Sequence, residues 1–114
     1  MIKTQFGIIE DIEETQTYSY NPEKYHCTFI DDEVYIDDWW NQLRLLKTYF
    51  HNLNRPEFGL ARYGITLISP ESLPAFQEIV LSDKRIQEDD NLVKLAETIQ
   101  DAICRNKYMI HFGI

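Results

Sequence analysis

The stretch NKYMIHFGI, residues 106–114, decides the fold that we expect for this chain. Apolar residues alternate through it with a period of two, which places successive side chains on opposite faces of a β-strand. One face would carry Tyr108, Ile110, Phe112 and Ile114, and the other Met109, His111 and Gly113. Because the alternation continues almost to the last residue, we predict a strand that is paired inside a sheet and not a frayed end.

Two amphipathic helices are predicted immediately before this strand. The first opens within SPESLPAFQEIVLSD, residues 69–83, with Ser69 or Ser72 as its cap and a proline in its first turn. The second begins at Asp89 or Asp90. Their inner faces are expected to be Leu73, Phe76, Ile79 and Val80 in the first helix, and Leu92, Leu95, Ala96, Ile99, Ala102 and Ile103 in the second.

A third helix is predicted from Asp37 to about residue 53, ahead of Pro56. Asp37 is its expected N-cap, and Asp38 would complement the helix dipole in the first turn. Its apolar stripe recurs at intervals of four, three, four and three residues: Trp39, Leu43, Leu46, Phe50 and Leu53.

The remaining segments favour strands. We expect strands at residues 5–10, 25–30 and 61–69, and a weaker one at 15–20, with a turn at NPEK, residues 21–24. The order is then β-(β)-β-α-β-α-α-β. This order predicts a single α+β domain over residues 1–114, a two-layer sandwich in which three helices pack on one face of a mostly antiparallel sheet of about 4–5 strands.

Charge is distributed unevenly along the 114 residues. Residues 1–38 hold ten acidic and two basic side chains, whereas residues 39–114 hold nine of each, so the net charge of −8 belongs to the first third. This asymmetry argues against nucleic acid or an anionic membrane as a direct partner and favours a basic protein. Plain solubility is the alternative explanation.

The composition also bears on the compartment. The two cysteines do not make a disulfide framework, and we interpret both as reduced core thiols. No apolar run reaches the length of a membrane span, and the first residues turn acidic after one lysine, the wrong order for a signal peptide. We therefore expect a cytoplasmic protein.

Catalytic and ligand motifs are absent from the sequence. There is no glycine-rich phosphate loop, nucleophile elbow or zinc-protease motif, and His26, His51 and His111 lack metal-ligand spacing. We expect no metal and no cofactor, and we favour a function without catalysis.

The strongest candidate for a binding surface is FIDDEVYIDDWWNQLRLL, residues 29–46. On a helical wheel Trp39 lies in the apolar stripe, whereas Trp40 lies about 100° away, on the face of Arg44. Trp40 is then either a half-buried residue packed by arginine and lysine stems or an interaction anchor. The predicted binding residues are Trp40, Asp37, Asp38, Asp31, Asp32, Glu33, Tyr35 and Arg44.

In overall profile, and not in any motif, the chain resembles small acidic bacterial immunity or inhibitor proteins that neutralise a toxin. The resemblance implies a non-enzymatic domain that binds a basic protein partner, such as a toxin, through an acidic and aromatic surface. The alternative is a small enzyme or ligand-binding domain with a pocket between sheet and helices that uses His111 or His26 with a carboxylate. A homo-oligomer formed through the Trp40 face is a third possibility.

Overall fold

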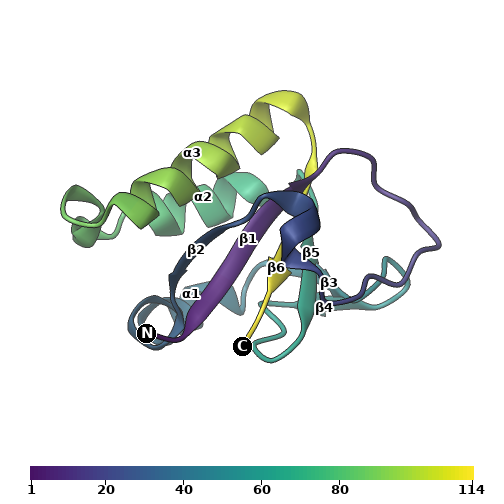
Figure 1. Cartoon of the computed structure of the whole chain (residues 1–114), viewed down its shortest axis with the longest axis horizontal. Helices are drawn as coiled ribbons and strands as arrows, with labels where there is room; N and C mark the ends of the chain where they lie inside the picture. Colours follow the sequence, from purple (N-terminus) through teal and green to yellow (C-terminus); the bar gives the residue numbers. More distant parts are fainter.

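A single antiparallel sheet of six strands organises the chain (Figure 1). The computed structural model describes all 114 residues. The strands are β1 (Lys3–Ile9), β2 (Thr28–Asp31), β3 (Lys47–Phe50), β4 (Pro56–Phe58), β5 (Ile65–Ile68) and β6 (Tyr108–Phe112). They lie in the order β2-β1-β6-β5-β3-β4, and every neighbouring pair is antiparallel.

The C-terminal strand lies in the interior of the sheet, as its alternation predicts. Phe112 of β6 is opposite Gln5 of β1 on one side and Ile65 of β5 on the other. Met109, Ile110 and Phe112 are fully buried. Strand β6 thus joins the first strand of the chain to the middle of the sheet.

Three helices cover one face of the sheet: α1 (Asp37–Leu43), α2 (Leu73–Leu81) and α3 (Asp90–Arg105). In Figure 1, α2 and α3 lie side by side, and α1 lies near the N-terminal end of β1. All three contribute to the main core cluster, with Trp39, Phe76 and Leu95 among its 19 buried residues. None of these helices is long and apolar enough to cross a lipid bilayer.

The opposite face of the sheet is covered by the irregular segment that joins β1 to β2. Tyr18 from this segment belongs to a second buried cluster with Ile110 and Phe112. The Tyr20 hydroxyl donates a hydrogen bond to the Gly113 carbonyl over 2.7 Å. The segment also contains η1, a 3₁₀ turn at Pro22–Tyr25, where a simple turn is predicted.

The α+β class and the helical layer are therefore confirmed, with six strands in place of about 4–5. The long helix predicted after Asp37 is wrong beyond Leu43, because Lys47–Phe50 forms β3. Before α1 the chain makes one wide π-helical turn, η2 (Asp32–Ile36), capped by the Asp31 carboxylate. A short 3₁₀ turn, η3 (Lys84–Gln87), links α2 to α3.

Several smaller expectations are also corrected. No strand forms at residues 15–20, β5 is shorter than the predicted 61–69, and β4 was not predicted. Neither cysteine is a core residue, since Cys104 is exposed and Cys27 only half-buried, although both are free thiols.

Candidate functional site

The acidic stretch that the sequence marks as a binding surface is largely occupied by internal contacts. Asp32 is 1% exposed and its Oδ1 lies 2.7 Å from Arg62 Nη2. The Nη1 atom of the same guanidinium lies 2.6 Å from the Asp37 carboxylate. Asp38 pairs with Arg85 over 3.0 Å. Arginines from the neutral part of the chain thus compensate three of the five carboxylates in this stretch.

The aromatic residues around this stretch serve the core. Tyr35 is buried and its hydroxyl donates a 2.6 Å hydrogen bond to Asp89. Burial, and then this hydrogen bond, raises the pKa of Tyr35. Trp39 is buried and donates from Nε1 to Asp83 over 2.9 Å. The Arg85 guanidinium beside Asp83 holds the pKa of that carboxyl at about 2.

Trp40 is half-buried against the main core. The cation over its ring is Arg62, at 5.7 Å from the ring centroid, and not Arg44, which is exposed and forms no ion pair. Glu33 is exposed, and Asp31 accepts a long 3.4 Å bond from the Val34 amide. The structure therefore groups Trp40, Asp37 and buried Asp32 around Arg62, and leaves Arg44 apart.

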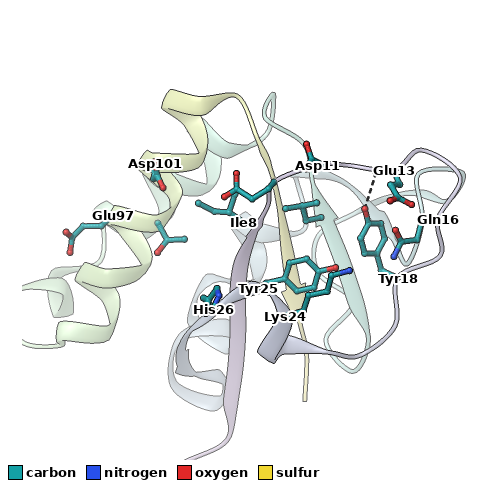
Figure 2. Close-up of a pocket in the computed structure, with 13 residues that line it drawn as sticks. Ile8, Asp11, Glu13, Gln16, Tyr18, Lys24, Tyr25, His26, Glu97 and Asp101 are labelled. Atoms are coloured by element: carbon teal, nitrogen blue, oxygen red, sulfur yellow. Dashed lines mark hydrogen bonds between the residues drawn. The ribbon is translucent and has the colours of Figure 1, made fainter.

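A different part of the molecule carries an open groove of about 730 Å³ (Figure 2). It lies between the end of β1, helix α3 and the segment that contains Tyr18 and η1. Its lining residues are Ile8, Ile9, Glu10, Asp11, Glu13, Gln16, Tyr18, Lys24, Tyr25, His26, Glu97, Thr98 and Asp101. We call this hollow the α3 groove.

The α3 groove is strongly acidic, with five carboxylates and a single lysine in its lining. Arg105 on its border pairs with two of the carboxylates, Glu10 at 2.6 Å and Asp101 at 3.0 Å. The hydrogen bond from Arg105 lowers the pKa of Glu10. Three further carboxylates are exposed and form no ion pair: Asp11, Glu13 and Glu97.

Apolar and aromatic side chains form the floor of the groove. Ile8 from β1 and Tyr25 from η1 lie at its centre (Figure 2). Tyr18 borders it, and its hydroxyl accepts a 3.2 Å hydrogen bond from the Glu13 amide, which holds the acidic segment in place. The hollow thus combines an apolar floor with a rim of negative charge.

The two histidines of the predicted pocket have different positions. His111 is buried in the sheet between the Thr4 and Thr66 hydroxyls, at 2.7 and 3.2 Å, and does not line the groove. Burial lowers its pKa to about 3. His26 does line the groove, exposed and in a left-handed conformation, but it makes no hydrogen bond to a carboxylate. Nowhere do three potential ligand side chains gather closely enough to hold a metal ion.

None of the residues that line the α3 groove is among the predicted binding residues. The only signal in the sequence is the acidic run EDIEE, residues 10–14. This run lies close to Glu97 and Asp101 only because α3 packs beside β1, and no local sequence pattern predicts that packing. No protein-family model, curated protein or solved structure matches this chain.

Proposed function

We propose that this chain is a non-enzymatic domain that binds a basic protein partner, and that the α3 groove is its principal contact. The observation that supports this proposal is the set of unpaired carboxylates, Asp11, Glu13 and Glu97, around an apolar floor. Carboxylates without an internal partner accelerate the approach of a positive surface, and burial of the apolar floor stabilises the complex.

The surface of residues 31–40 has a weaker claim as the centre of the interface. Its exposed members Asp37 and Asp38 already contact arginines, so a partner would have to compete with Arg62 and Arg85. Glu33 and half-buried Trp40 remain available as secondary contacts. An inhibitor of a basic toxin is one function that fits this arrangement, in the cytoplasm, where both free cysteines stay reduced.

A second candidate function uses the same groove as a pocket for a small cationic ligand. The presence of His26 among the lining carboxylates favours it. However, His26 makes no hydrogen bond or ion pair with a carboxylate. The groove is open and its unpaired acids are exposed, which suits a large positive surface better than a small ligand that must be mostly enclosed. We therefore favour the protein partner.

The proposal is tested with charge-reversed variants in affinity capture from the lysate of the source organism. Asp11→Lys/Glu97→Lys reverses the groove, and Glu33→Lys/Asp37→Lys reverses the predicted surface. Glu57→Lys/Glu88→Lys changes two exposed acids elsewhere by the same charge. We expect a stoichiometric partner of net positive charge that binds the wild type and the Glu57→Lys/Glu88→Lys control. Its affinity for the groove variant should fall about tenfold or more.

Each capture result has a defined meaning. Loss of the partner only with Glu33→Lys/Asp37→Lys, while this variant unfolds in urea at the same midpoint as the wild type, would move the interface to residues 31–40 and overturn the assignment of the groove. Absence of any basic partner, or equal binding by all variants, would reject the proposed function.

A further inference from the structure

Strand β1 has an open edge on the floor of the α3 groove. Its pairing with β2 covers only Lys3–Phe6, whereas its pairing with β6 continues to Ile9. Residues 7–9 therefore have a neighbouring strand on one side only. Unpaired strand edges are ready templates for another extended segment.

The backbone of Ile8 points to this open side. Successive residues of a strand direct their N–H and C=O groups to alternate sides. The Ile2 carbonyl accepts a hydrogen bond from the Asp32 amide, on the β2 side. Ile8, six residues further on, therefore has its own N–H and C=O on that same side, beyond the last residue of β2 that pairs with β1.

The chain leaves this position free by turning away from it. Continuing the β1–β2 register would place His26 opposite Ile8. Instead His26 adopts a φ of 51°, and the segment Tyr25–Cys27 crosses over the face of β1 at Gly7. A Cβ at Gly7 would lie 2.8 Å from the Tyr25 Cβ, so only glycine permits this crossing. Beyond it, Ile8 lies between α3 and η1 (Figure 2).

We infer that the α3 groove takes an extended basic peptide segment of the partner, which adds to the sheet as a short strand beside Ile8. This inference rests on the proposed function and specifies how the groove recognises its partner. Main-chain hydrogen bonds to Ile8 would align the segment, in the manner of β-strand addition.

The charges of the groove select the side chains of the added strand. Because its side chains alternate between two faces, one set points toward α3 and the other toward η1 and the segment after β1. A lysine or arginine in the first set would pair with Glu97. A lysine or arginine in the second set would pair with the unpaired acids Asp11 and Glu13. A segment of about three or four residues spans the open edge.

The test begins with a library of random 12-residue peptides displayed on phage and selected against the whole protein. We expect enrichment of peptides that carry two or more lysine or arginine residues within a stretch of three or four residues, with at least one on each face of the added strand. An enriched peptide is then synthesised in forms that carry one backbone N-methyl group each. N-methylation should lower the affinity about tenfold or more at the one residue whose amide donates to the Ile8 carbonyl, and should have little effect at its two neighbours, whose amides point away from β1. The Ile8 amide should become protected from hydrogen exchange in the complex.

Two results separate this inference from the proposed function. If basic peptides bind, lose affinity with Asp11→Lys/Glu97→Lys and tolerate every single N-methyl group, strand addition is wrong and the groove remains the binding site. If the enriched peptides are not basic, or bind the groove variant as well as the wild type, both the strand addition and the groove are rejected.

Discussion

Arg62 pairs with two carboxylates of the acidic stretch at residues 29–46, which the sequence alone predicts to be a free binding surface. It contacts Asp32 and Asp37 and lies over the ring of Trp40. Asp32 is almost fully buried, and its Oδ2 atom has no hydrogen-bond partner. The Asp32 charge is therefore balanced almost entirely by the Arg62 guanidinium. Arg62 also holds Asp37 and Trp40, so the four residues belong to the internal packing of the fold.

Removal of Arg62 should destabilise the protein strongly. Arg62→Met leaves the Asp32 carboxylate buried and uncompensated, which typically costs about 3 kcal/mol or more. Arg62→Met/Asp32→Asn removes both charges, so we expect this double variant to be more stable than Arg62→Met alone. Urea unfolding of the wild type, Arg62→Met, Asp32→Asn and the double variant measures the coupling. Arg105→Met is the control, because its partners Glu10 and Asp101 are exposed. Additive effects of the two substitutions would contradict the coupling.

At the scale of elements, the sequence predicts best where a long pattern has one interpretation. Helix α3 buries Leu92, Leu95, Ile99 and Ala102 on its predicted face, and Asp89 caps it by accepting from the Asn91 amide. Strand β6 lies inside the sheet as expected. Both segments are long relative to their period, and this removes the ambiguity between helix and strand.

The failure after Leu43 has a physical reason. Leu46, Phe50 and Leu53 fit a helical stripe, but Thr48, Tyr49 and Phe50 are three consecutive residues that favour strands. Pairing of β3 with β4 and β5 decides between the two. The pairing of β3 with its neighbours is a tertiary contact. The packing of β1, η1 and α3 that forms the groove is also a tertiary contact. The sequence could not predict either from local patterns.

The segment Tyr25–Cys27 crosses β1 at Gly7, and we expect its position to depend on the missing side chain of Gly7. In Gly7→Ala the new methyl group would lie 2.9 Å from the Cys27 Sγ and close to Tyr25, so the crossing segment must move outward. We expect a loss of about 1–3 kcal/mol in stability and faster thiol labelling. Cys27 should label slowly in the parent, because burial raises its pKa to about 11.

The labelling is measured with a disulfide reagent in a Cys104→Ser background, since Cys104 is exposed. The matched control is Gly64→Ala, whose methyl group would contact His51 and not Cys27. An unchanged rate at Cys27 in Gly7→Ala would show that the crossing segment does not depend on the missing side chain.

For the whole molecule, folding redistributes the charge asymmetry of the chain. Of the acids in the first third, Glu10, Asp32, Asp37 and Asp38 pair with arginines from the later part. The acids that stay unpaired include Asp11 and Glu13, at the α3 groove, and Glu33. The sequence predicts an acidic surface, but only the fold determines where that surface lies.

His111, in the interior of the sheet, should make the global stability of the protein depend on pH between pH 7 and pH 5. Burial lowers the pKa of His111 to about 3, well below the ordinary value of about 6.5 that it takes in the unfolded chain. As pH falls through this window, the unfolded chain binds a proton that the folded protein excludes, so stability falls. Between pH 7 and pH 5 the wild type should lose about 2 kcal/mol more than His111→Gln, measured by urea unfolding at each pH. His26, His51 and the carboxylates are common to both proteins and cancel in the comparison. Parallel stability curves for the two proteins would mean that His111 accepts a proton in the folded state, despite its burial between Thr4 and Thr66.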